Sequence, residues 1–126
     1  MIFDERSMPL MAYPLVTILA EKLETVISRD VGNTRPRDYY DLYTLWHTRR
    51  TEVDPNALEA ALRATSEKRH TVATMGNYRE AMERVASDSG MLSQWATYAR
   101  RYPYVGEMTL RQTCDVVIEI MRAIAW

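Results

Sequence analysis

The chain has 126 residues, of which 47% are hydrophobic and 26% are charged, and its formal net charge is −1. This composition is typical of one globular domain, and the small net charge excludes a strong overall attraction for nucleic acid. No apolar run approaches the roughly 18 residues of a membrane span, and no secretory signal is visible. A lone cysteine, Cys114, excludes an internal disulfide, so we expect a reduced thiol in a cytoplasmic protein that makes no membrane contact.

The amino-terminal segment, residues 1 to 12, shows no helical period, and we expect an extended lead-in with an edge strand over Ser7 to Tyr13. A helix follows, because Pro14 suits the first helical position. Its apolar stripe repeats at the spacing of one helical face and comprises Leu15, Ile18, Leu19, Leu23, Val26 and Ile27.

Lys22 falls inside this apolar stripe, almost directly over Leu15, and Arg29 lies two turns further on. Glu21 and Glu24 are assigned to the outer, polar face of the same helix. One interpretation is a lysine that covers apolar surface with its stem and keeps its ammonium in water. The other is an ammonium directed into a cleft for a phosphate.

A short turn over Asp30 to Arg35 connects this helix to the next, and Gly32 and Asn33 suit the left-handed residue after a helix. Pro36 then starts a second helix, and its buried stripe is expected to contain Tyr39, Leu42, Tyr43 and Trp46.

Asp38 and Asp41 stand three residues apart along one edge of that stripe. Each has an ordinary explanation, since Asp38 in the first turn favours the helix dipole and Arg37 with Asp41 forms an i, i+4 ion pair. If the two helices pack antiparallel, however, both carboxylates meet Lys22, Arg29 and Arg35 at one corner. Such a cluster points to phosphate chemistry.

The remainder of the chain, residues 54 to 126, is predicted to be a helical tail. Asp54 with Pro55 starts one helix, Asn77 with Glu80 resembles a capping box, and Asp88 caps the next helix, which ends before Pro103. Thr109 with Gln112 starts the last helix. The tail stripes are expected to include Leu58, Leu62, Ala81, Met82, Val85, Leu92, Trp95, Tyr102, Leu110, Cys114, Val117 and Met121, and the segment 71 to 76 is ambiguous.

Small basic groups occur near the ends of three predicted helices, where cations also complement the helix dipole. As a set they could contact the phosphates of an RNA. They are Arg49 with Arg50, Lys68 to His70, and Arg100 with Arg101.

The order of residues 3 to 46 resembles the carboxy-terminal half of the AbiEii/AbiGii toxin family. The resemblance rests on AYPLVTILAEKLETVISR followed by NTRPRDYYDLYTLW. Members of that family are nucleotidyltransferases that act as toxins of type IV toxin–antitoxin systems in abortive infection. Its Ala-Glu-Lys-Leu helix and its Arg-(Lys/Arg)-Asp-x-x-Asp helix belong to the active site.

By this resemblance, Lys22, Asp38 and Asp41 are candidate catalytic residues, and Lys22, Arg29 and Arg35 are candidate nucleotide-binding residues. It also implies a nucleotide ligand, tRNA or another RNA as acceptor, and an antitoxin as partner. The family's catalytic head carries Gly-Ser followed by Asp-x-Asp on a strand, and this chain contains no such pattern. We therefore expect that the chain holds no metal itself, while Mg²⁺ and a nucleoside triphosphate are implied for the full enzyme.

The sequence thus predicts an all-α bundle of about six helices forming one domain, with residues 13 to 50 as the motif-bearing helix pair. Its expected function is that of the helical half of an AbiEii-like nucleotidyltransferase, inactive without a metal-binding amino-terminal head on a missing or separate segment. The alternative is a non-catalytic helical interaction module, or toxin remnant, in which the same charges are only ion pairs.

Overall fold

A computed structural model describes residues 14 to 32 and 35 to 126, and over these ranges the chain is all-α, with no strand. It contains seven α-helices, one more than expected, because the ambiguous segment forms a short helix. The helices are α1 (Leu15–Arg29), α2 (Pro36–Arg49), α3 (Pro55–Lys68), α4 (Val72–Met75), α5 (Tyr78–Ser87), α6 (Ser89–Arg101) and α7 (Leu110–Ala123). Short 3₁₀ turns η1 (Asp30–Gly32), η2 (Arg50–Glu52) and η3 (Pro103–Val105) connect some of them.

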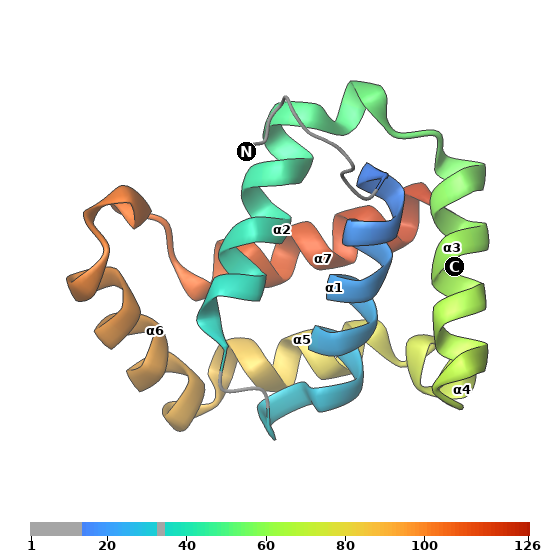
Figure 1. Ribbon diagram of the computed structural model, residues 1–126. Helices are drawn as coiled ribbons and strands as arrows, with labels where there is room; N and C mark the ends of the chain where they lie inside the picture. Colours follow the sequence, from blue (N-terminus) through green and yellow to red (C-terminus); the bar gives the residue numbers. More distant parts are fainter. Residues whose placement is uncertain (1–13, 33–34) are drawn as a thin grey trace.

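Helices α1 and α2 run in opposite directions side by side, as Figure 1 shows, and α3 packs along the other side of α1. Helix α7 crosses behind them and packs against α2 and α5. Helix α6 stands at the edge of the bundle beside α2 (Figure 1). The predicted apolar stripes therefore meet in one core, which includes Leu19, Leu23, Ile27, Leu42, Trp46, Leu58, Leu62, Met82, Val85, Leu110, Val117, Ile120 and Met121.

Side chains at the helix starts confirm three of the predicted caps. The Asp54 carboxylate accepts a hydrogen bond from the Asn56 N–H at 3.0 Å, and the Asp88 carboxylate accepts one from the Met91 N–H at 2.9 Å. Thr109 forms a full capping box with Gln112. These bonds satisfy backbone donors that have no partner within the helix.

The predicted capping box at Asn77 is wrong, since its side chain makes no capping hydrogen bond. The turn that follows α4 leads directly into α5, and within this turn the Asn77 N–H donates a hydrogen bond to the Thr74 carbonyl oxygen at 3.0 Å. The prediction that Leu92 is buried is also wrong. Its side chain is 45% exposed, and Met91 takes the buried place on α6.

The exit from α1 differs from the expected glycine turn. The residue with positive φ is Asp30, at 56°, and not Gly32, while Asn33 lies outside the described residues. Arg84 on α5 donates to the Asp30 carboxylate at 2.6 and 3.0 Å. This ion pair holds an uncommon backbone conformation for a non-glycine residue. The predicted edge strand over residues 7 to 13 also lies outside the described ranges.

Glu24 is the clearest departure from the helical pattern of α1. The helical period predicts its side chain on the outer face, yet the residue is only 3% exposed. Arg69 and Thr71 reach across from the end of α3 and donate to its two carboxylate oxygens. The buried charge is thus compensated by residues 45 and 47 positions away in the sequence. None of the helices in the described part is both long and apolar enough to span a membrane.

Candidate functional site

Lys22 lies between the two aspartates of α2. Its Nζ donates a hydrogen bond to Asp38 Oδ1 at 3.1 Å and lies 3.1 Å from Asp41 Oδ2. The Lys22 side chain is 23% exposed and that of Asp41 25%, whereas the Asp38 side chain is only 5% exposed. The lysine therefore does not simply extend into bulk water; its ammonium is held by two carboxylates at the surface of the bundle.

The antiparallel packing of α1 and α2 explains this arrangement. Lys22 lies near the middle of α1, and the first two turns of α2 run past it. Asp38 and Asp41 are three residues apart, so both carboxylates emerge on the same side of α2. Neither helix forms the cluster by itself.

Two arginines add to the cluster. Arg35 Nε lies 3.3 Å from Asp38 Oδ2, and Arg37 Nε lies 3.7 Å from Asp41 Oδ2, which confirms the predicted i, i+4 pair. Although Asp38 Oδ2 is close to Arg35, it accepts no well-aligned hydrogen bond from the described residues. Among the described residues at this corner, three cations, Lys22, Arg35 and Arg37, lie beside the carboxylates of Asp38 and Asp41.

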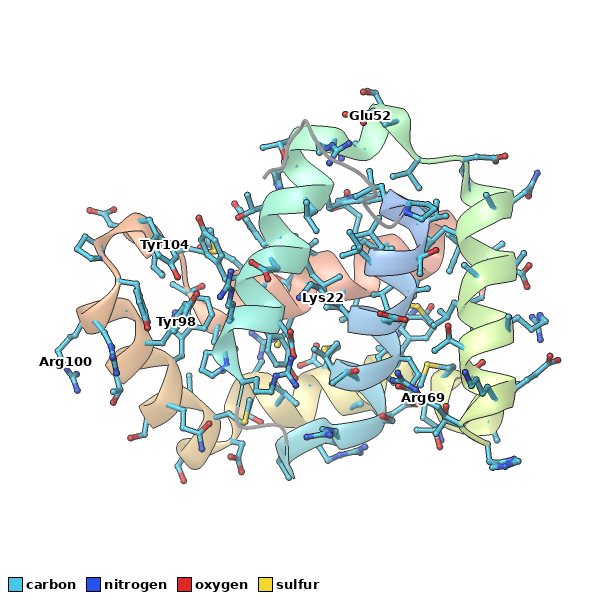
Figure 2. The ribbon with its side chains drawn as sticks, in the orientation of Figure 1. Lys22, Glu52, Arg69, Tyr98, Arg100 and Tyr104 are labelled. Carbon is cyan, nitrogen blue, oxygen red and sulfur yellow. The ribbon has the colours of Figure 1, made fainter. Side chains whose placement is uncertain are left out.

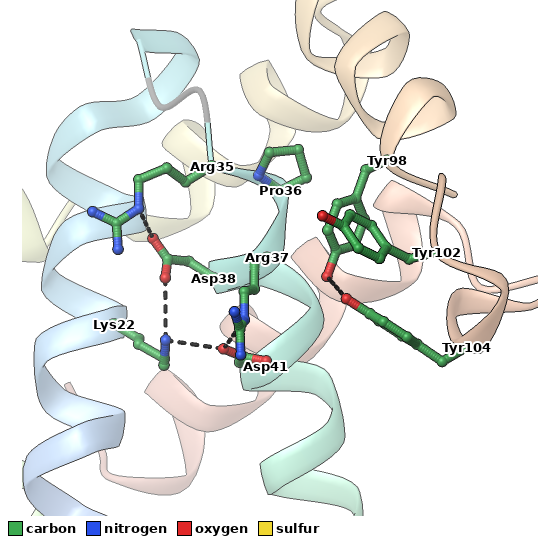
Figure 3. A pocket seen from close by; sticks show the side chains of 9 residues that line it. All are labelled: Lys22, Arg35, Pro36, Arg37, Asp38, Asp41, Tyr98, Tyr102 and Tyr104. Carbon is green, nitrogen blue, oxygen red and sulfur yellow. Dashed lines mark hydrogen bonds and ion pairs between the residues drawn. The ribbon is translucent and has the colours of Figure 1, made fainter. Parts of the chain in front are cut away.

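A hollow of about 520 Å³ opens beside this cluster. One wall is charged and contains Lys22, Arg35, Arg37, Asp38 and Asp41. Figure 3 shows the opposite wall, which we call the tyrosine wall: Tyr98, Tyr102 and Tyr104, from α6 and the turn that follows it. Pro36 lies between the two walls. The volume falls within the range of small-molecule sites.

The tyrosine wall is internally fixed. The Tyr98 and Tyr104 hydroxyls are 2.7 Å apart and share a hydrogen bond, and the ring centroids of Tyr98 and Tyr102 are 5.0 Å apart. Burial raises the pKa of Tyr98, and the hydrogen bond to Tyr104 and the nearby Asp41 carboxylate add to the rise. This phenol therefore stays neutral at physiological pH and does not repel an anionic ligand.

Arg29 does not share this hollow. It lines an adjoining hollow of about 440 Å³ together with Arg35, Arg69 and the buried Glu24. A third hollow, which contains Lys22, Arg35 and Arg69, lies between the two. Arg35 thus borders all three, and the hollows follow the corner between α1 and α2.

Asp38 and Asp41 are the two carboxylates that the described part of the cluster offers to a divalent cation. Mg²⁺ and Ca²⁺ prefer several oxygen ligands around one position, but here the ammonium of Lys22 occupies the space between the two carboxylates. Over the described ranges, no group of three or more histidine, cysteine, aspartate or glutamate side chains could hold a metal ion. We therefore assign no reaction step to a metal on these residues.

Three of the seven basic residues considered for RNA form ion pairs within the described part of the chain. Arg49 pairs with Glu52 at 2.7 Å and Arg50 with Glu119 at 3.0 Å, while Arg69 pairs with Glu24. Figure 2 shows Arg100 on the outer side of α6, away from Lys22. Of these residues, Arg69 lines a hollow together with Lys22 and Arg35.

The structure brings Lys22, Asp38, Asp41 and Arg35 together as the sequence predicted and places Arg29 one hollow away. Their catalytic and binding roles remain predictions. The tyrosine wall is a part of the site that the sequence did not predict. A usable signal was present, since three tyrosines surround Pro103 in TYARRYPY, but only the packing of α6 beside α2 turns them toward Lys22.

This fold and this cluster define a helical protein with a hollow that is lined by charged side chains on one wall and by tyrosines on the other. The family model described as "Nucleotidyl transferase AbiEii toxin, Type IV TA system" matches residues 1–116, and the chain therefore belongs to that family. No curated protein and no solved structure matches the chain significantly. Family membership supports a function related to nucleotidyltransferase toxins and makes an antitoxin the expected class of partner.

Proposed function

We propose that this chain supplies the phosphate-binding face of an AbiEii-type nucleotidyltransferase, with Lys22 and Arg35 as the residues that contact the phosphates of a nucleoside triphosphate. The observation that carries the proposal is the position of the Lys22 ammonium, held by two carboxylates at the rim of a hollow of about 520 Å³. An ammonium has three donors. Two carboxylate oxygens lie at 3.1 Å from it within the described part of the chain, so a further donor can serve a phosphate oxygen.

The two aspartates have different surroundings, which suggests different roles. Asp38 is nearly buried between Lys22 and Arg35, so we assign it as a positioning residue that fixes the ammonium. Asp41 is more exposed and lies nearer the tyrosine wall. It is the better placed of the two to accept a hydrogen bond from the hydroxyl group of an acceptor.

Arg35 completes the phosphate contacts, and Arg29 extends them. The guanidinium of Arg35 borders all three hollows along the corner of α1 and α2, and a guanidinium matches two phosphate oxygens at once. Arg29 is separated from Lys22 and would contact only a ligand that reaches the adjoining hollow.

Nucleotidyl transfer relies on divalent cations to neutralise charge on the reacting phosphates. The family's Gly-Ser…Asp-x-Asp pattern is not found in these 126 residues. We therefore propose that the chain binds a nucleoside triphosphate but transfers none unless another segment contributes that carboxylate pair. For the active enzyme we propose an RNA such as tRNA as the acceptor substrate and an antitoxin as the protein partner.

A second function is favoured by one observation, namely that Lys22, Asp38 and Asp41 already satisfy one another as ion pairs. On that reading the cluster only joins α1 to α2 in a non-catalytic interaction module or toxin remnant. The two functions differ in one measurable respect. Only the first requires that removal of the ammonium weakens the binding of polyphosphate.

The test is a calorimetric titration of the 126-residue chain with ATP and with inorganic tripolyphosphate, in the presence and absence of Mg²⁺. The chain has two lysines, so Lys22→Met is compared with Lys68→Met, which removes an exposed ammonium at the end of α3. We expect weaker binding only for Lys22→Met and no transfer of labelled nucleotide to RNA. Equal binding by both variants would refute the phosphate role, and robust transfer by the purified chain would refute the division of labour.

A further inference from the structure

The tyrosine wall has more exposed aromatic surface than the packing of α6 requires. Trp95 is buried, and its Nε1–H donates to the Met108 carbonyl oxygen at 3.0 Å, which anchors α6 to the start of the α7 segment. Tyr98 packs against Trp95 with ring centroids 5.7 Å apart. Tyr104, in contrast, is 53% exposed, although its ring lies 4.8 Å from that of Tyr40 on α2. Packing accounts for Trp95 and Tyr98 but not for the exposure of Tyr104.

The arrangement keeps the ring of Tyr104 in one place while leaving much of it open. Its hydroxyl is held by that of Tyr98 at 2.7 Å, and its ring centroid lies 5.4 Å from that of Tyr102. Figure 2 shows Tyr98 and Tyr104 pointing from the α6 side toward α2. An aromatic surface that is fixed in advance loses little conformational entropy when a planar ligand stacks on it.

The tyrosine wall lies opposite charged side chains, and this arrangement limits the chemical classes of ligand that fit the hollow. The tyrosine wall faces Lys22, Arg35 and Arg37 across a single hollow. A ligand that fits both walls needs an anionic group at one end and a flat, π-rich group at the other. Nucleotides have both, and base stacking on aromatic side chains tolerates any of the bases.

We propose that the tyrosine wall, with Tyr104 and Tyr102 as its contacting rings, stacks a nucleobase whose attached phosphates lie at Lys22 and Arg35. This inference rests on the proposed phosphate role of Lys22 and extends it to the base. The base belongs either to the bound nucleoside triphosphate or to the end of a single-stranded RNA. Both present the same chemistry to the wall, and the experiment separates them.

The test compares three probes: inorganic tripolyphosphate, which has no base; the four nucleoside triphosphates; and single-stranded RNA tetramers. The variants are Tyr104→Leu, the double variant Tyr102→Leu/Tyr104→Leu, and Tyr104→Phe, which keeps the ring but loses the hydroxyl. The matched control is Tyr43→Leu, because Tyr43 lies on α2 and stacks on His47 with centroids 4.1 Å apart, outside the hollow. Circular dichroism and the thermal midpoint confirm that each variant is folded.

We expect Tyr104→Leu to weaken binding of the base-bearing probe about 5- to 150-fold, and the double variant to weaken it further. Tyr104→Phe keeps the ring but loses the hydrogen bond to Tyr98 that fixes it, so it should weaken binding of the base-bearing probe less than Tyr104→Leu does. Tyr43→Leu should bind like the wild type, and tripolyphosphate binding should not change in any of the four variants. A loss seen only with nucleoside triphosphates assigns the base to the nucleotide, and a loss seen only with RNA assigns it to the acceptor.

Failure of this inference is distinguishable from failure of the proposed function. Suppose that Lys22→Met weakens tripolyphosphate binding but the tyrosine variants bind every probe like the wild type. The tyrosine wall then does not bind the base and the inference is overturned, while the phosphate role of Lys22 stands. If tripolyphosphate and nucleotides do not bind, or bind independently of Lys22, the phosphate role is refuted and the inference is refuted with it.

Discussion

Replacement of Lys22 by methionine tests whether the cluster between α1 and α2 is a ligand site or a structural ion pair. Methionine keeps the length of the apolar stem and removes the charge. Lys22 Nζ lies 3.1 Å from both Asp38 Oδ1 and Asp41 Oδ2. An exposed pair contributes at most about 1 kcal/mol, whereas removing one partner of a buried pair costs about 3 to 5 kcal/mol.

The structure places this cluster between those limits. The Asp38 side chain is 5% exposed but keeps Arg35 at 3.3 Å, and Asp41 is 25% exposed and can be rehydrated. We therefore expect Lys22→Met to lower the free energy of unfolding by about 1 to 2 kcal/mol, in the lower half of the span between exposed and buried pairs. Urea denaturation followed by circular dichroism measures this loss.

The effect of Lys22→Met on tripolyphosphate binding should be separate from its effect on stability. A charge-assisted hydrogen bond contributes about 1.5 to 3 kcal/mol, so we expect the Kd for tripolyphosphate to rise about 10- to 150-fold in Lys22→Met. The double variant Lys22→Met/Asp38→Asn removes the carboxylate that the single variant leaves without its lysine. It should recover much of the lost stability but none of the binding.

A single result would refute this reasoning. If Lys22→Met loses stability while its tripolyphosphate affinity stays within about twofold of that of the Lys68→Met control, the contribution of a phosphate contact is absent. The ammonium would then serve only to join the two helices. If binding recovers in the double variant, the carboxylate rather than the ammonium controls the affinity.

Three further predictions concern the helices that hold the site. Glu24→Ala should destabilise the fold by about 1.5 to 3 kcal/mol, because it removes the acceptor of Arg69 and Thr71, whereas the exposed neighbour Glu21→Ala should unfold in urea like the wild type. Asp88→Ala removes the cap of α6 and should lower the thermal midpoint through a loss of about 1 kcal/mol; an unchanged midpoint would show that this cap is not needed. Burial raises the pKa of the Cys114 thiol to about 12 from an ordinary value of 9.0. The unfolded chain therefore loses the thiol proton at a lower pH than the folded chain does, and the free energy of unfolding should fall as pH rises from 9 toward 12. Denaturation midpoints measured over that pH range should fall less in Cys114→Ala, and equal falls would contradict the role of the thiol.

Much of the fold was predictable because its signals are local. A cap depends on residues within one turn, and Asp54, Asp88 and Thr109 were therefore identified correctly from the sequence. The period of the apolar stripes indicated which faces enter the core. The order of residues around Lys22, Asp38 and Asp41 carried the family resemblance, which the family model confirms.

Local signals failed where a distant part of the chain changes the environment of a residue. Helical period assigned Glu24 to the solvent face, but Arg69 covers it from a position 45 residues away. The same period predicted Leu92 in the core, but on α6, which stands at the edge of the bundle, Met91 and Trp95 are buried while Leu92 is 45% exposed. The helical period shows which residues share a face of the helix, but it does not show which other parts of the chain pack against that face.

The features of the site also separate into those that local sequence determines and those that depend on distant parts of the chain. The sequence by itself determined that a lysine occupies an apolar stripe and that two aspartates share an edge of the next helix. Only the tertiary structure decided that the ammonium lies between both carboxylates, that Arg29 belongs to a neighbouring hollow, and that Tyr98, Tyr102 and Tyr104 face the cluster. The physical reason is that these contacts join helices far apart in the chain, and their geometry follows from how the complete core packs rather than from the propensity of any one segment.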